Sequence, residues 1–184
     1  MSSPKGLNFS TPEIDNIRIT PLQSFFPDND TYQGVFHIHQ IRAPQHFTRC
    51  DGLLFLPKEN RNSSTMVLDL NLEPLYIKKL GKVFDFGSNL IYISSHSHLD
   101  HAAHVYAWEQ LGAKIIAPSP HHKRLQNIEN FLEEFGFYER MDPSIARRFP
   151  ELMNYRPCKY VECFEPGFPL DINGLKVETI PLDG

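Results

Sequence analysis

Four of the nine histidines of this chain and one aspartate lie within eleven consecutive residues, 94–104, with the sequence SSHSHLDHAAH. This segment directly follows a largely apolar run, NLIYI, at 89–93. Imidazole and carboxylate groups are donors with which proteins bind zinc, iron and manganese. The residue types and their spacing therefore predict a metal site, and two metal ions at such a site activate water for hydrolysis.

Each candidate ligand has a position that suits its role. His96 and His98 alternate at the end of an expected strand, so both rings project to one side and can hold one cation at about 2.0–2.1 Å. Asp100 and His101 follow where the loop enters a helix, and they can face a second cation roughly 3.5–4 Å from the first. We therefore predict two divalent metal ions, zinc first and iron or manganese as alternatives. Asp100 is also the predicted catalytic residue, because a carboxylate beside the water can take up its proton.

These residue types also have simpler interpretations. A single histidine usually has a structural or surface role, and Asp100 alone would be an ordinary helix N-cap. His37 and His39 share one strand face, as metal-binding histidines of amidohydrolase barrels do, but such a barrel needs about 250 residues. We expect a structural or substrate-rim role for this pair. Three further histidines are expected in packed, surface or pocket-rim positions: His104, His121 and His122.

Short strands separated by turn residues are expected in the first half of the chain, because β-rich runs alternate with clusters of Gly, Pro, Asn and Asp. The expected strands cover residues 16–20, 35–42, 52–56, 65–69 and 89–95. Apolar residues spaced by three then predict a helix over 102–111, followed by a strand at 114–117. This order of strand, histidine-rich loop, helix and strand is typical of an α/β fold.

The sequence becomes helical from 119 to about 156, with Ser119 as the expected N-cap ahead of Pro120. An amphipathic stripe is formed by Ile128, Phe131, Leu132 and Phe135. This helical insertion either covers the sheet or forms a lid over an apolar substrate. Strand character returns at 159–164, 168–172 and 175–182, and Asn173-Gly174 predicts a hairpin between the last two strands.

The composition is that of one soluble globular domain, with 184 residues, 41% of them hydrophobic and 22% charged. The formal net charge of −4 argues against a nucleic-acid partner. Three scattered cysteines are too few for a disulfide framework, so we expect reduced thiols and a cytoplasmic location. The chain shows no signal-peptide segment and no apolar run of membrane-spanning length, so no membrane contact is expected.

The motif of residues 96–101, HSHLDH, resembles the His-x-His-x-Asp-His motif of the metallo-β-lactamase superfamily. The resemblance extends from the early strands through the helix to the strand ending in IIAP, and it is to the N-terminal half of that family. It implies one domain over 1–184, an αββα sandwich with metals at one edge, and a helical insertion at about 119–156. It also implies that Asp69, in VLDLNLEP, does not bind the metal itself but orients the residues that do. The glycine that commonly follows in the family is absent here.

The last residues, NGLKVETIPLDG, resemble the family strand that leads into Gly-His. In the family that histidine completes the three-histidine set of the first metal, and further ligands follow it. We therefore expect a fold truncated after its first half. Such a half-sandwich would expose an apolar face, so it is expected to pair with its own copy or with a missing C-terminal half.

The function predicted from the motif and the resemblance is metal-dependent hydrolysis, in which activated water attacks a small-molecule ester, thioester or lactone. Fold and motif do not identify the substrate. Two alternatives stay open: a phosphodiesterase or nuclease-type member, and an incomplete or catalytically dead metal-binding module that acts in assembly.

Overall fold

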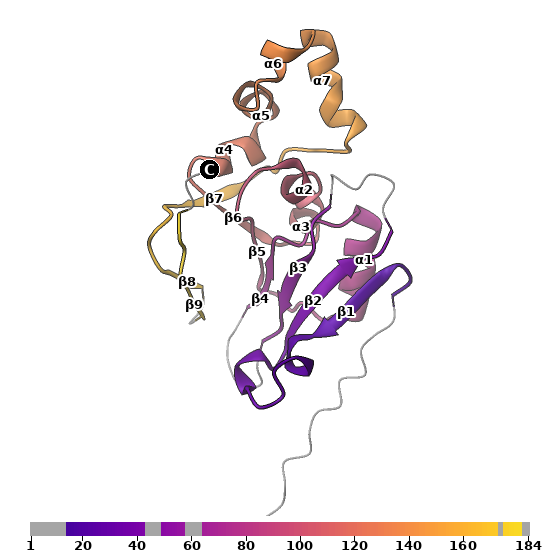
Figure 1. Cartoon of the computed structure of the whole chain (residues 1–184), viewed down its shortest axis with the longest axis vertical. Helices are drawn as coiled ribbons and strands as arrows, with labels where there is room; N and C mark the ends of the chain where they lie inside the picture. Colours follow the sequence, from indigo (N-terminus) through magenta and orange to yellow (C-terminus); the bar gives the residue numbers. More distant parts are fainter. Residues whose placement is uncertain (1–13, 43–48, 58–63, 173–174, 182–184) are drawn as a thin grey trace, which may run out of the picture.

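The computed structural model describes residues 14–42, 49–57, 64–172 and 175–181. Within these ranges a seven-stranded sheet has its strands side by side in chain order (Figure 1). Neighbouring strands are antiparallel from the first to the fourth and parallel from the fourth to the seventh. The strands are β1 (Ile17–Pro21), β2 (Val35–Gln40), β3 (Gly52–Phe55), β4 (Thr65–Leu68), β5 (Leu90–Ile93), β6 (Lys114–Pro118) and β7 (Val161–Phe164).

Helices connect the parallel strands, because neighbouring parallel strands require a crossover. The chain passes from β4 to β5 through α1 (Pro74–Val83) and from β5 to β6 through α2 (Leu99–Ala102) and α3 (Val105–Gln110). The crossover from β6 to β7 contains α4 (His121–Gln126), α5 (Ile128–Glu134), α6 (Phe137–Arg140) and α7 (Pro143–Leu152). Two short 3-10 helices, η1 (Leu22–Ser24) and η2 (Asp30–Tyr32), lie between β1 and β2. No helix in the described ranges is long and apolar enough to cross a membrane.

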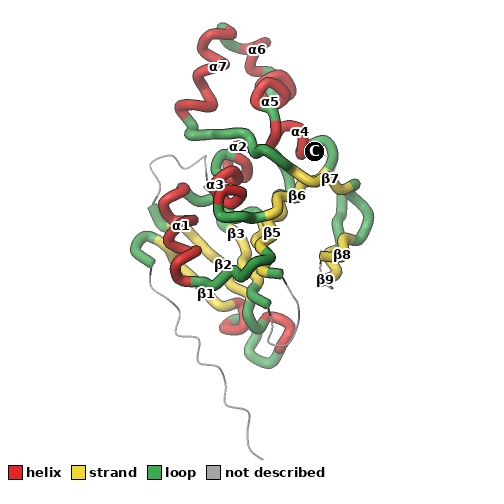
Figure 2. The backbone as a smooth tube through the Cα atoms, turned by 180° about the vertical axis from the view of Figure 1, so that it is seen from behind, coloured by secondary structure: helices red, strands yellow, loops and turns green. Residues whose placement is uncertain are grey.

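The two faces of the sheet pack against different elements. On one face Ile38 and Tyr92 are fully buried and belong to the same core as Leu80 of α1 and Trp108 of α3. The other face carries a smaller cluster, which the hairpin of β8 (Leu170–Ile172) and β9 (Leu175–Val177) joins. Figures 1 and 2 agree that α1, α2 and α3 cover one face, while α4–α7 extend past the edge of the sheet.

The predicted α/β class is confirmed, and each predicted strand has a counterpart within a few residues. The helix predicted over 102–111 begins earlier, at Leu99, and is interrupted before Val105. The interruption has a physical cause, since the backbone of His104 is not helical and its N–H donates to Asn71 Oδ1 at 2.8 Å. A tertiary hydrogen bond therefore replaces one turn of the expected helix.

Ser119 is not the N-cap predicted for the helical region, and this prediction is wrong. The N–H of Ser119 donates to Phe164 O at 2.9 Å, which extends the hydrogen bonding between β6 and β7. The Ser119-Pro120 peptide is cis, Pro120 occupies the N-cap position, and α4 begins at His121. The backbone N–H of Ser119 therefore takes part in sheet hydrogen bonding and not in a helix-capping turn.

The predicted C-terminal hairpin is present as an antiparallel pair of β8 and β9. Its predicted turn, Asn173-Gly174, lies outside the described residues. The last strand was expected over 175–182, whereas β9 ends at Val177. Beyond that point Thr179 Oγ1 accepts from Gly167 N–H at 3.0 Å and donates to Phe168 O at 2.7 Å, so a side chain takes the place of strand pairing.

Gly52 begins β3 at a very close approach to the backbone of the next strand. A Cβ atom there would lie 2.3 Å from Leu68 O and 2.5 Å from Leu70 N. These two atoms directly flank Asp69, so the missing side chain at Gly52 allows β3 to fix the backbone from which Asp69 projects.

We predict that Gly52→Ala lowers the free energy of unfolding by roughly 1–3 kcal/mol, because the clash is with backbone that cannot move aside cheaply. The matched control is Gly81→Ala in α1, where the added Cβ meets only ordinary contacts, the nearest at 3.5 Å. That change should raise stability by roughly 0.5–1 kcal/mol through helix propensity. Urea unfolding followed by circular dichroism measures both, and equal effects at the two positions would contradict the prediction.

Candidate functional site

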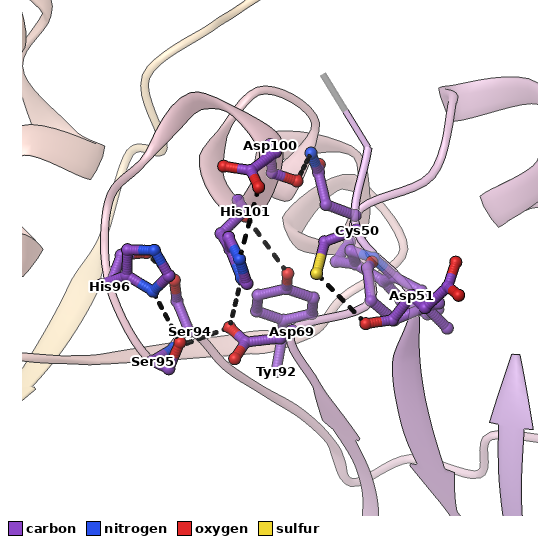
Figure 3. Close-up of polar contacts among 12 residues, drawn as sticks. Cys50, Asp51, Asp69, Tyr92, Ser94, Ser95, His96, Asp100 and His101 are labelled. Atoms are coloured by element: carbon purple, nitrogen blue, oxygen red, sulfur yellow. Dashed lines mark hydrogen bonds and ion pairs between the residues drawn. The ribbon is translucent and has the colours of Figure 1, made fainter. Parts of the chain in front are cut away.

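The motif residues lie at the edge of the sheet where the parallel strands β4, β5 and β6 end. Asp69 follows β4 directly, and its own N–H donates to Ile93 O at 3.0 Å. Its carboxylate accepts from the N–H of Ser95 at 2.7 Å and so holds the start of the loop after β5 (Figure 3). Loops at the carboxyl ends of parallel strands are where α/β proteins place their ligand sites.

Three motif histidines lie together in this loop. The ring centroids of His96 and His98 are 4.6 Å apart, and those of His96 and His101 are 4.1 Å apart. His98 is exposed, whereas His96 and His101 are half-buried. The His96 ring therefore lies between those of His98 and His101.

Carboxylates lie on both sides of His101. Its Nδ1 is 3.4 Å from Asp69 Oδ1, and its Nε2 is 3.6 Å from Asp100 Oδ2 (Figure 3). Nδ1 is buried and has no well-directed hydrogen bond, so its attraction to Asp69 is mainly electrostatic. Burial lowers the pKa of His101, but Asp69 and Cys50 outweigh it and raise that pKa to about 10. Burial raises the pKa of Asp69, and its contacts with His101 and Ser95 outweigh that and lower it.

Two residues beside this cluster were missed by the sequence analysis. Asn71 is fully buried and links three segments, since its Nδ2 donates to Asp100 O, its Oδ1 accepts from His104 N–H, and its backbone pairs with Cys50. The Cys50 side chain points toward His101 in Figure 3, and its thiol also interacts with that ring. For Asn71 the sequence gives one signal, a polar residue between two leucines in LDLNLEP, and for Cys50 it gives none.

A second polar network holds the loop from the other side. Ser97 is fully buried, and its hydroxyl lies 3.0 Å from Arg124 Nη1 and 3.0 Å from His121 Nδ1. Arg124 is 8% exposed and forms an ion pair with Glu134 of α5. The ring of His121 stands edge-on to that of His96, with centroids 6.3 Å apart. An arginine in the helical insertion therefore fixes the residue between two candidate ligands.

The insertion also supplies an apolar wall. The Phe135 ring lies 5.4 Å from the His98 ring, and the Arg124 guanidinium lies 5.4 Å from Phe135. Phe131 and Tyr155 are buried and stack on each other at 5.0 Å, so they cover the core. Both functions expected of this segment, covering the sheet and facing a substrate, thus have residues that suit them.

The other histidine pair forms its own cluster with a carboxylate. His39 Nδ1 lies 2.7 Å from both oxygens of Asp51, and His37 Nε2 lies 3.7 Å from one of them. All three side chains are about one-third exposed or more. They contribute a polar surface on β2 and at the start of β3, in keeping with a structural or rim role.

The motif region has the donor types of a metal site. In the described part of the chain no three His, Cys, Asp or Glu side chains are arranged as a group ready to hold a metal ion. The donor set nevertheless suits a divalent cation. Ser95 Oγ lies 2.8 Å from His96 Nδ1 and can accept a hydrogen bond from Nδ1–H. The Nε2 lone pair of His96 is then available to a metal. Burial and the neighbouring imidazoles lower the pKa of His96, which favours the neutral ring that a metal requires, whereas at His101, whose pKa is raised, a cation would have to displace a proton.

No family model matches the chain, and no curated protein matches it either. The assignment to the metallo-β-lactamase superfamily therefore stays a prediction that rests on the motif.

His104 lies beneath the site and away from solvent. It is 3% exposed, and its buried Nδ1 has no hydrogen-bond partner among the described residues. Burial lowers the pKa of His104 to about 4, although a backbone contact with Leu72 acts in the opposite direction. His104 is therefore a packed core residue that folds in its neutral form.

We predict that the metal-free protein loses stability as the pH falls from about 6.5 to about 4. Unfolded His104 takes up a proton near pH 6.5, whereas the folded protein resists protonation down to about pH 4. The unfolded state thus binds more protons, and about 3 kcal/mol of unfolding free energy is lost over this window. Urea unfolding at a series of pH values, with chelator present, measures it.

The matched variant is His104→Gln, which keeps a polar side chain but does not titrate. Its dependence of stability on pH should be shallower than that of the wild type by about one proton in this window. Equal slopes in the two proteins would show that His104 does not control acid unfolding.

Proposed function

We propose that this chain belongs to a metal-dependent hydrolase that cleaves a small-molecule ester, thioester or lactone with activated water. The observation that carries the proposal is the packing of His96, His98 and His101 at centroid distances of 4.1–4.6 Å, with two carboxylates next to His101. Three imidazoles gathered at the carboxyl ends of parallel strands have few structural uses, since two of them are half-buried and no hydrogen bond joins these described rings to one another. A divalent cation would use all of them.

The proposal includes the αββα architecture that the motif implies. The described sheet supports it, because one face is covered by α1–α3 while the opposite face carries the apolar cluster of Met66, Ile91, Ile93 and Ile116. A sheet that is apolar on both faces needs a layer on each. Leu170 and Val177 of the β8–β9 hairpin already pack against this cluster, so in this proposal the hairpin is the start of the second sheet.

Each motif residue has a distinct role in the proposed reaction. When bound, the two cations supply water of lowered pKa and polarise the carbonyl that is attacked. His96 and His98 would hold the first cation, and His101 and Asp100 would hold the second. Asp69 orients His101 through its contact with Nδ1, which leaves Nε2 on the side of Asp100. Asp100, whose side chain is 45% exposed, can reach the water and take up its proton.

The surroundings favour an acyl substrate over a phosphodiester of a nucleic acid. The wall beside His98 is the aromatic ring of Phe135, which suits the apolar part of an acyl group. The chain carries a net charge of −4, and nucleic-acid sites are basic.

We predict that protein purified without chelators or a histidine tag binds about two equivalents of zinc, as the two-metal site requires. The double variant His96→Gln/His98→Gln should lose at least one equivalent, because it removes the first cation's ligands. Elemental mass spectrometry on folded protein measures the content.

A matched pair of histidines provides the control for this experiment. His37→Gln/His39→Gln changes two alternating histidines that lie on β2 and contact Asp51, so its metal content should equal that of the wild type. Loss of metal from the control and not from the motif variant would place the metal elsewhere and refute the proposal.

We predict that Asp100→Asn lowers kcat by roughly 10²–10⁴-fold for thioester, lactone or ester hydrolysis, because the amide cannot accept the proton. One zinc equivalent should be lost with it. Asp51→Asn, a carboxylate change outside the motif, should leave both quantities unchanged. Metal binding by the wild type without hydrolysis of any of these substrates or of phosphodiesters would favour the non-enzymatic module instead.

A further inference from the structure

The hydrogen bonds of His121 determine which of its nitrogens carries the proton. Its Nδ1 lies 3.0 Å from Arg124 Nη1 and 3.0 Å from Ser97 Oγ. A guanidinium group has donors only, so Nδ1 has to accept from Arg124. The neutral ring must then carry its proton on Nε2.

His96, whose ring centroid lies 6.3 Å from that of His121, shows the opposite case. Its Nδ1 is 2.8 Å from the hydroxyl of Ser95, and a hydroxyl can accept as well as donate. His96 can therefore keep its proton on Nδ1 and offer the Nε2 lone pair to a metal. His121 cannot do this while Arg124 faces its Nδ1, because two N–H groups would then point at each other.

The partners of His121 are rigidly held. Ser97 is fully buried, and Arg124 is 8% exposed and paired with Glu134. Tyr155 OH donates to the backbone carbonyl of Arg124 at 2.7 Å and so also holds the backbone of α4 at this residue. The tautomer of His121 is thus fixed by groups that have little freedom to rearrange.

Nε2 of His121 remains available to a ligand. It makes no hydrogen bond within the described part of the chain, and the His121 side chain is only partly buried. The ring stands at 81° to that of His96, with centroids 6.3 Å apart. A donor therefore lies beside the histidines that the proposed function assigns to the metals.

We propose that His121 donates a hydrogen bond from Nε2–H to the acyl oxygen of the substrate and does not bind a metal. This inference rests on the proposed hydrolase function for its substrate and on the Arg124 contact for its tautomer. In the attack on an ester, thioester or lactone the carbonyl oxygen gains negative charge, and a pre-oriented N–H donor stabilises that charge. Arg124 is then a positioning residue, because it acts through His121.

The first part of the test measures the tautomer directly. Nitrogen NMR of histidine-labelled protein distinguishes a protonated Nε2 from a protonated Nδ1, and the proposal expects His121 to show Nε2–H with and without zinc. In Arg124→Gln, whose amide can accept as well as donate, that preference should be lost. A proton on Nδ1 of wild-type His121, or a change of tautomer when zinc is added, would overturn the proposal.

The second part separates a substrate donor from a metal ligand. His121→Leu should keep the zinc content of the wild type, while its kcat/KM for phenyl thioacetate falls on the order of 10²-fold. His121→Gln should recover most of this loss, because its amide N–H can replace the donor. A loss of zinc from both variants, or an unchanged kcat/KM in folded His121→Leu protein, would refute the role of His121.

The outcome for the wild type keeps the two proposals apart. If the wild-type chain binds no zinc, the proposed hydrolase function fails and the substrate role of His121 fails with it, whereas the NMR spectrum still decides the tautomer. If the wild type binds zinc and hydrolyses the thioester, failure of the His121 variants to respond refutes the inference alone.

Discussion

Ser97 is completely buried, and its hydroxyl lies in hydrogen-bond range of Arg124 and His121. In an extended segment successive side chains point to opposite sides, so burying Ser97 sends His96 and His98 together to the other side. The rest of the candidate site depends on this single orientation. If Ser97 turned outward, the two histidines would point into the core, away from the loop surface where the site lies.

The same edge of the sheet is held from the opposite direction by Asp69 and Asn71. Asp69 accepts from the loop after β5, and Asn71 bonds to Asp100 in α2 and to His104 at the start of α3. The histidine loop therefore lies between two sets of polar groups, one from the segment after β4 and one from the insertion. Each set is buried and largely satisfied, which gives the loop a unique position, since breaking either set would leave polar groups without partners.

Much of the fold and part of the site could be predicted from the sequence because those features are local. Alternation and turn residues identify the strands, and the spacing of His96, His98, Asp100 and His101 identifies the candidate ligands. The features that could not be predicted join distant segments: Arg124 to Ser97, Asn71 to His104, and Ser119 to Phe164. In each case a tertiary hydrogen bond overrides the local preference, as where Ser119 extends the sheet instead of capping a helix. No periodicity in a single sequence carries that information.

The placement of Arg124 in the crossover between β6 and β7 has a consequence for how the site forms. This crossover is the longest connection among the parallel strands, and closing a long loop is entropically costly and slow. The strands β1 to β6 can pair before it docks, but Ser97 acquires its buried partner only afterwards. The histidine loop is therefore expected to reach its final order only when α4, the first helix of this crossover, docks beside β6.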